Sequence, residues 1–193
     1  MRVVYEYSHL GGSEIMQVTY PDHLREMYSV ITKVHASRSK LSQERTKQGR
    51  MLYAPKKMNG EFREAFLAAG YSELRDTYTI ALPDYPVRIS GAYKRVDFVE
   101  DRVLVEVQFG KYASMFYDMA KFRYFFNENR ADVGVEIVPC HALHHQMSSG
   151  VSYGEQLVSD IERLKRHFPA VPVKVMLIDV DVDAAAGPGT TEP

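Results

Sequence analysis

Alternation of apolar and polar positions predicts strands in several parts of the chain. In the segment 103–109 the side chains alternate with a period of two, so Leu104, Glu106 and Gln108 share one face of the strand. A run such as 132–139, which is apolar almost throughout, is typical of a strand buried on both faces. The same criteria predict further strands at residues 2–7, 15–20, 77–82, around Asp97, and at 171–180.

Helical periodicity separates these strands. Apolar residues three and four positions apart predict helices that begin at Pro21 and that cover residues 59–69, 112–129 and 154–168. The 112–129 helix is rich in aromatic residues, which indicates packing in the core or at a subunit interface. The segment 37–50 is polar, basic and non-periodic, and we expect a loop or a loosely structured arm there. The pattern predicts an α/β fold with a mixed sheet flanked by helices.

Length and composition predict one soluble domain. The chain has 193 residues, and we expect a single domain over residues 1–182, followed by a disordered tail of small residues at 183–193. A single cysteine, Cys140, excludes an internal disulfide and fits a reducing cytoplasm. The sequence contains no apolar run long enough to span a membrane and no signal peptide, so a cytoplasmic location without membrane contact is expected.

Charge gives only a local indication of a nucleic-acid partner. The formal net charge is −1, so total charge does not predict a polyanionic ligand. Residues 36–65 contain eight basic and three acidic side chains, a net charge of +5. Such a patch is more often a solvated surface than a nucleic-acid site.

Two carboxylates and an amide form the main candidate for chemistry. Asp97 and Glu106 lie on two expected neighbouring strands, and Gln108 follows Glu106 by two positions. Magnesium takes oxygen ligands and is commonly held by one or two carboxylates together with substrate phosphates. The alternative is a strand pair whose acids face solvent or form salt bridges, and the spacing leaves both interpretations open.

Three histidines form a second polar cluster. His141, His144 and His145 lie close together in "HALHHQ", a spacing that zinc can use. No cysteine or further acid stands at ligand spacing, so a surface helix or loop is the expected structure.

The motif resembles the PD-(D/E)xK nuclease fold, with Gln108 at the position where most members have lysine. That replacement is typical of the BglII-like restriction endonucleases. Segments such as "TKQGRMLYAP", "DFVEDRVLVEVQFGKY" and "MSSGVSY" resemble the BglII/BstYI family, and its BstYI-type members most of all, in the same order from Met1 to about Val180. The region 79–94 is shorter here and departs from that pattern.

The resemblance implies a homodimeric, Mg²⁺-dependent type II restriction endonuclease that cuts both strands of a palindrome in double-stranded DNA. The BstYI type implies the site RGATCY, cut after the first purine to leave GATC 5′ overhangs. Three alternatives remain: an enzyme for the narrower site AGATCT, a DNA-binding protein that does not cleave because the lysine is missing, and a metabolic α/β protein with structural acids.

The resemblance also implies roles for individual residues. Asp97 and Glu106 match the metal-binding carboxylates, and Gln108 matches the third catalytic position, where an amide positions the attacking water. Glu73 is a candidate additional acid, although an exposed surface acid is the favoured reading. The expected DNA contacts are to bases from Lys111, Ser149 and, as a weaker candidate, Ser148, and to the backbone from Lys47, Gln48 and Arg50.

Overall fold

A six-stranded mixed sheet forms the centre of the protein in the computed structural model, which describes residues 1–181. The sheet order is β1 (Arg2–His9), β8 (Val173–Asp179), β7 (Val133–Pro139), β6 (Val103–Val107), β5 (Arg88–Glu100) and β4 (Ser72–Ala81). Strand β7 runs parallel to β6 and β8, whereas the other neighbours are antiparallel. The predicted mixed α/β sheet is therefore confirmed, and the predicted tail at 183–193 lies outside the described residues.

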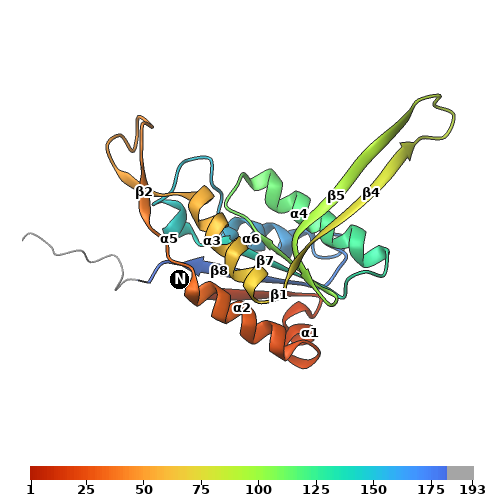
Figure 1. Ribbon diagram of the computed structural model, residues 1–193, viewed down its shortest axis with the longest axis horizontal. Helices are drawn as coiled ribbons and strands as arrows, with labels where there is room; N and C mark the ends of the chain where they lie inside the picture. The colour runs from red at the N-terminus through yellow and green to blue at the C-terminus, as the bar shows by residue number, and fades with distance from the viewer. Residues whose placement is uncertain (182–193) are drawn as a thin grey trace, which may run out of the picture.

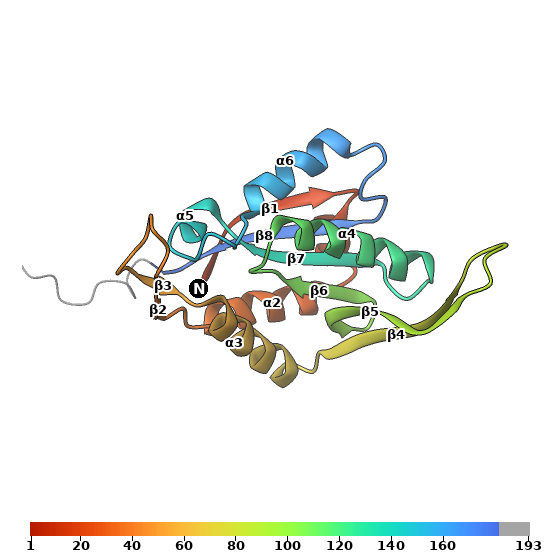
Figure 2. The same cartoon turned by 90° about the horizontal axis from the view of Figure 1, so that it is seen from above.

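Helices cover both faces of this sheet. They are α1 (Gly12–Val18), α2 (Pro21–Lys33), α3 (Pro55–Ala68), α4 (Tyr112–Asn127), α5 (His141–His144) and α6 (Gly154–Leu164). Figures 1 and 2 show α4 and α6 on one face and α1 and α2 on the other. Because neither face is open to solvent, every residue of β6 and β7 is buried. The acidic residues on these two strands are thus held inside the protein.

The aromatic helix α4 packs into the core. Its buried face carries Met115, Met119, Phe122 and Phe125, and α4 lies against β7. Tyr117 is exposed on the opposite side. Core packing therefore accounts for most of the apolar residues that the sequence placed in this helix.

The strand predicted at 15–20 is wrong, because this segment forms helix α1. Its apolar residues at 15, 16 and 18 are too few to distinguish the two periodicities, and only Met16 is fully buried. Tertiary packing decides the outcome: a Cβ on Gly12 would lie 2.3 Å from the backbone of Val173, so the glycine lets α1 approach β8 closely.

The loop expected over residues 37–50 is wrong in part. Strand β2 (Arg38–Leu41) pairs antiparallel with β3 (Met51–Tyr53) in a separate two-stranded sheet. All four residues of β2 are exposed, so no side-chain alternation marks this strand in the sequence. We call the segment 38–53 the basic arm.

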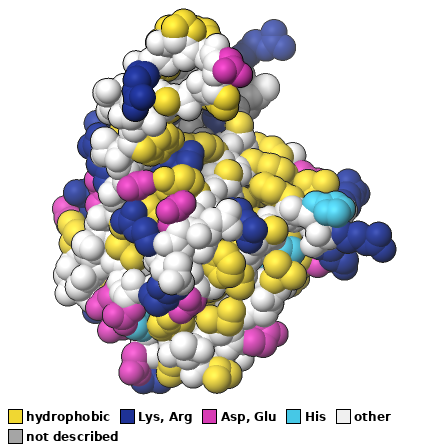
Figure 3. Space-filling view, turned by 90° about the vertical axis from the view of Figure 1, so that its right-hand side faces the viewer, with side chains coloured by type: hydrophobic (Ala, Val, Ile, Leu, Met, Phe, Trp, Pro, Cys, Tyr) yellow, Lys and Arg dark blue, Asp and Glu magenta, His cyan; other side chains and the backbone are white. Residues whose placement is uncertain are grey.

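A second projection is the long hairpin of β4 and β5, in which β4 starts earlier than the predicted 77–82. The basic arm and this hairpin rise on the same side of the molecule at its two ends (Figure 1). Figure 3 views the molecule from the hairpin end and shows hydrophobic, basic and acidic side chains interspersed there. The exposed apolar residues of the hairpin are Leu82, Tyr85, Val87, Ile89 and Tyr93. Among the described residues, no helix is long and apolar enough to cross a membrane.

Close packing of α4 on β7 gives a test of the fold. A Cβ at Gly134 would lie 2.4 Å from the ring of Phe122, which is fully buried and cannot move aside. We expect Gly134→Ala to destabilise the protein by about 1–3 kcal/mol in thermal or urea unfolding. The control is Gly60→Ala in α3, where nothing lies within 4 Å; it should stabilise by about 0.5–1 kcal/mol. Equal effects of the two substitutions would contradict this packing.

Candidate active site

The two predicted carboxylates lie on neighbouring antiparallel strands. The register pairs Phe98 of β5 with Val105 of β6, so Asp97 and Glu106 occupy the next position on each strand. Glu106 is only 2% exposed, whereas the side chain of Asp97 keeps 37% of its surface in solvent. The structure therefore brings these two acids together, with Asp97 on the solvent side.

Gln108 follows directly after β6 and has a fixed orientation. Its Nε2 donates a hydrogen bond of 2.8 Å to Oδ2 of Asp118, and its backbone N–H donates to the carbonyl of Ile137. A Cβ on Gly110 would lie 2.4 Å from Oε1 of Gln108, so only glycine leaves room for this conformation. The amide is thus held at Nε2 by Asp118, and its Oε1 lies beside Gly110.

Helix α4 supplies two charged residues that sequence reasoning missed, Asp118 and Lys121. Asp118 is 1% exposed and Lys121 is 8% exposed. The ammonium of Lys121 forms ion pairs with Glu106 and with Asp118, the latter at 2.7 Å. A signal was present, because Asp118 interrupts the apolar stripe that Met115, Met119 and Phe122 form at helical spacing.

Glu136 is a further acid that the sequence reading did not identify. It lies on β7, directly across the parallel register from Glu106, so the two side chains point to the same face. Both of its carboxylate oxygens are buried and lack a hydrogen-bond partner within the described part of the chain. The available signal was a glutamate inside an otherwise apolar strand.

Burial and mutual repulsion raise the pKa values of the three buried acids, Glu106, Asp118 and Glu136. Burial, with the charges of Asp118 and Asp97, raises the pKa of Glu106 well above its usual range, against the opposing effect of Lys121. Burial, Asp118 and Glu106 raise the pKa of Glu136 in the same way. The pKa of Lys121 is also raised, because the two carboxylates outweigh the effect of burial. The cluster of Asp97, Glu106, Asp118 and Glu136 therefore contains more acidic groups than the ammonium of Lys121 can pair with.

This excess of acid suits a divalent cation. Within residues 1–181, no three acidic, histidine or cysteine side chains converge as a complete metal site. Asp97 and Glu106 are nevertheless hard oxygen donors, and magnesium commonly takes one or two carboxylates and completes its shell with water and phosphate. The residues present fit such an ion in their chemistry, and both carboxylate oxygens of Glu136, across the register from Glu106, lack a hydrogen-bond partner within the described residues.

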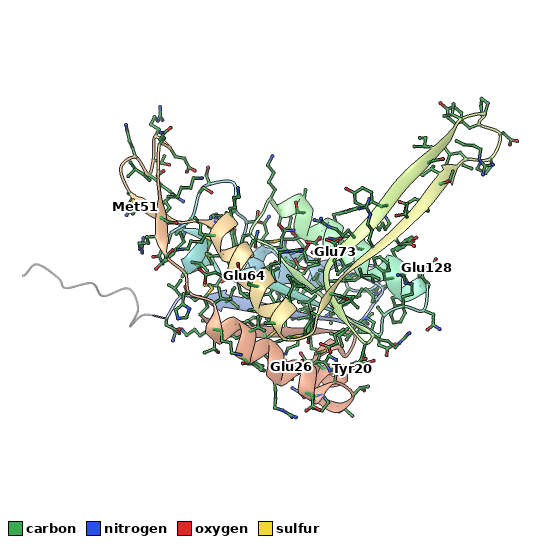
Figure 4. All side chains as sticks on the ribbon, in the orientation of Figure 1. Tyr20, Glu26, Met51, Glu64, Glu73 and Glu128 are labelled. Carbon is green, nitrogen blue, oxygen red and sulfur yellow. The ribbon has the colours of Figure 1, made fainter. Side chains whose placement is uncertain are left out.

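A cavity of about 240 Å³ lies beside Asp97 and has basic and amide walls. Asn59 and Arg63 of α3 line it together with Arg95 and Asp97 of β5. Arg95 also forms an ion pair of 3.5 Å with Glu73, which stands at the end of β4 nearest the body of the protein (Figure 4). Glu73 is exposed, and its link to the site runs through Arg95, which lies 3.9 Å from Asp97. Sequence reasoning did not identify Asn59, Arg63 or Arg95.

The predicted base-contacting residues lie close to the end of β6. Lys111 is exposed at the N-terminus of α4, three positions after Gln108. Ser149 is exposed, and Ser148 is partly buried in the same loop. A hydrogen bond from the backbone N–H of Ser152 to the carbonyl of Gly110 connects this loop to the segment after β6.

The basic arm is tied to the loop that carries Ser149. The ammonium of Lys47 donates to the carbonyl of Met147 at 2.6 Å, and the backbone N–H of Ser149 donates to the carboxylate of Glu44 at 3.1 Å. Gln48 and Arg50 have exposed side chains. The arm and the loop therefore form one continuous surface, in which Lys47 is already engaged within the protein.

The three histidines lie around helix α5. His141 and His145 approach each other with their Nε2 atoms 3.1 Å apart, and His144 is partly buried beside Tyr153. The described residues around them contain no cluster suited to a metal. The segment forms the predicted helix with His141 and His145 exposed, and Cys140 beside it is buried.

Comparisons with known proteins agree with this architecture. The family model described as restriction endonuclease BglII/BglIII matches residues 4–178. The crystal structure of BglII complexed with a DNA 16-mer matches with a TM-score of 0.72 and 19% identity, over 94% of this chain and 78% of that chain. Free BglII matches with a TM-score of 0.63 and 18% identity, over 93% of this chain and 81% of that chain. A search of curated proteins found no match.

These findings confirm the predicted fold class. The structural likeness is to restriction endonucleases with a PD-(D/E)xK-like core, although the sequence identity is low. The match extends over nearly the whole chain rather than over the motif alone.

The shifted pKa of Glu136 predicts a pH-dependent effect on stability. The unfolded chain releases this proton at the ordinary pKa and the folded protein only at higher pH, so wild-type stability falls as pH rises through this interval. Glu136→Gln should avoid that loss, so its Tm relative to wild type should increase from about pH 5 to about pH 8. The control Glu162→Gln should show a Tm difference from wild type that stays nearly constant over this range, because hydrogen bonds from Tyr7 and Lys165 lower the pKa of Glu162 and its carboxylate is already ionised in both states above about pH 5. A Tm difference for Glu136→Gln that stays constant with pH would refute the prediction.

Proposed function

The chain belongs to the BglII/BglIII restriction endonuclease family and is a type II site-specific deoxyribonuclease, and we propose that it cuts R/GATCY with Mg²⁺ as a homodimer. The observation that supports this most directly is the position of Asp97 and Glu106 on neighbouring strands with Gln108 directly after them. The specificity rests on the resemblance of several sequence segments to BstYI-type members.

In this proposal Asp97 and Glu106 hold the divalent ion. A bound Mg²⁺ would neutralise charge on the scissile phosphate and make water a stronger nucleophile. Gln108 donates its amide N–H to Asp118, which leaves Oε1 as the acceptor that orients the attacking water. Water attacks phosphorus in line, the bond to the 3′ oxygen breaks, and the products carry a 5′-phosphate and a 3′-hydroxyl.

The walls of the cavity beside Asp97 supply contacts to the DNA backbone. Arg63 and Arg95 carry positive charge next to the carboxylate, and Asn59 adds an amide donor. Arginine binds phosphate oxygens through two parallel N–H groups, which suits it to orient a phosphodiester. We assign Glu73 to holding Arg95 through their ion pair.

Bases are read by Lys111 at the start of α4 and by the loop that carries Ser149, which lies beside the basic arm. Lys111 donates to guanine O6 and N7, and the hydroxyl of Ser149, with Ser148 as a weaker candidate, contacts a base edge in the outer pair. Gln48 and Arg50 contact phosphates without reading sequence, whereas Lys47 acts mainly by holding the loop through Met147.

A homodimer follows from the symmetry of the proposed site. A palindrome presents the same contacts twice around a two-fold axis, and two copies of one chain related by the same axis can read both halves and cut both strands.

Digestion of a defined plasmid tests the proposal. With Mg²⁺ and wild-type protein we expect cuts only within RGATCY that leave GATC 5′ overhangs, identified by sequencing the ends. EDTA should abolish cutting, and Glu106→Ala should reduce the rate by at least about a thousandfold while DNA binding persists.

Other outcomes separate the alternatives. Cuts confined to AGATCT would show that the enzyme recognises this narrower site rather than RGATCY. A folded wild-type protein that binds the site and leaves it intact with Mg²⁺ would reject cleavage in favour of DNA binding alone.

Base and backbone contacts should respond differently to substitution. Lys111→Ala should weaken binding to RGATCY by about 1–3 kcal/mol and leave non-specific binding nearly unchanged. Arg50→Ala should weaken binding to all sequences and reduce the slope of log affinity against log salt concentration by about two, one for each protomer of the dimer. Both effects are measured by fluorescence anisotropy in EDTA over a series of salt concentrations. The assignment fails if Lys111→Ala weakens cognate and random DNA to the same extent.

A further inference from the structure

Gln108 occupies the third motif position and supplies no positive charge there, whereas a lysine would. Helix α4 brings such a charge to the strand from another part of the chain, because Lys121 forms an ion pair with Glu106. We propose that Asp118 and Lys121 are positioning residues for the active site: Lys121 fixes Glu106 and Asp118 fixes Gln108. This inference rests on the proposed function of Glu106 and Gln108.

The geometry of the two elements supports this assignment. Glu106 and Gln108 are two positions apart along an extended segment, a separation of about 6.6 Å. Asp118 and Lys121 are three positions apart on a helix, where Cβ atoms lie about 5–6 Å from each other. The two spacings match, so each strand residue meets one helix residue.

The contacts join these four side chains in a row. Glu106 binds Lys121, Lys121 binds Asp118 at 2.7 Å, and Asp118 accepts from Gln108 at 2.8 Å.

Each helix residue constrains one group that the reaction needs. An ionised aspartate only accepts hydrogen bonds, so Asp118 selects the orientation of Gln108 in which the NH₂ group faces the helix and Oε1 faces away. Lys121 engages Oε1 of Glu106, so Oε2 is the oxygen available to a cation. The ammonium of Lys121 also places a fixed positive charge beside the carboxylate of Glu106. Gln108, at the third motif position, supplies no such charge.

The surroundings of these residues argue against a purely structural role. Burying an ion pair is costly, and apolar side chains of similar volume often stabilise such positions as well or better. The neighbouring positions of α4 are occupied by apolar residues such as Met115, Met119 and Phe122. The charged pair occurs on the buried face where α4 meets Glu106 and Gln108.

A double-mutant cycle tests the link between Asp118 and Gln108. Single-turnover cleavage of a short RGATCY duplex is measured in Mg²⁺ for wild type, Asp118→Asn, Gln108→Ala and the double variant. If Asp118 acts through Gln108, Asp118→Asn slows wild type by about 10–100-fold and slows the Gln108→Ala protein by less than about twofold. Rate losses that multiply in the double variant would overturn the proposal.

Lys121 provides a second test that does not depend on the activity of Gln108→Ala. Lys121→Met should slow cleavage by about a hundredfold, whereas Lys121→Arg, which keeps the positive charge, should recover at least about a tenth of the wild-type rate. DNA affinity in EDTA should change by less than about threefold for both variants. The matched control is Lys165→Met, which removes a lysine from the exposed ion pair with Glu162 and should leave cleavage unchanged.

The outcomes separate this inference from the proposed function. If wild type does not cut any DNA, the proposed function fails. If wild type cuts, and Lys121→Met alters its rate only in proportion to a loss of folded protein seen by circular dichroism, the positioning role alone is rejected.

Discussion

Buried acidic groups that outnumber their basic partner are the constraint on which the rest of the site depends. Glu106 and Glu136 lie side by side on strands that helices cover on both faces, where an unpaired carboxylate is unfavourable. Lys121 offsets part of this charge through Glu106 and Asp118. A cation held between Asp97 and Glu106 would offset more of it. Any affinity for such a cation would thus arise from this imbalance between acidic and basic groups rather than from a complete preformed cage of ligands within the described residues.

The topology links this imbalance to the surface proposed to contact DNA. Strand β5 carries Asp97 and continues outward into the projecting hairpin, while the chain after β6 passes through Gln108 and Gly110 to Lys111. The loop with Ser149 is joined both to Gly110, through Ser152, and to the basic arm. Short covalent and hydrogen-bonded connections therefore link the proposed catalytic residues to the residues proposed to contact bases.

Local patterns predicted most of the fold, and they failed where the local signal was weak. The buried strands β6, β7 and β8 are apolar along most of their length because both faces are covered, and the helices α2, α4 and α6 have periodic apolar residues because one side of each faces the core. Residues 15–20 were predicted as a strand and form α1 because Gly12 allows close packing on β8, a contact with residues far away in the sequence. Strand β2 was not predicted because all of its side chains are exposed, so its sequence shows no alternation of apolar and polar residues.

The sequence by itself determined the identity and spacing of Asp97, Glu106 and Gln108, since one strand pair and its period of two suffice to bring them together. It also determined the family, through ordered similarity along the chain. Only the tertiary structure decided which groups surround those three residues. Asp118 and Lys121 reach the site because α4 packs across the sheet, and Glu136 reaches it because β7 pairs in parallel with β6. Such neighbours depend on packing between distant segments, which no local periodicity encodes.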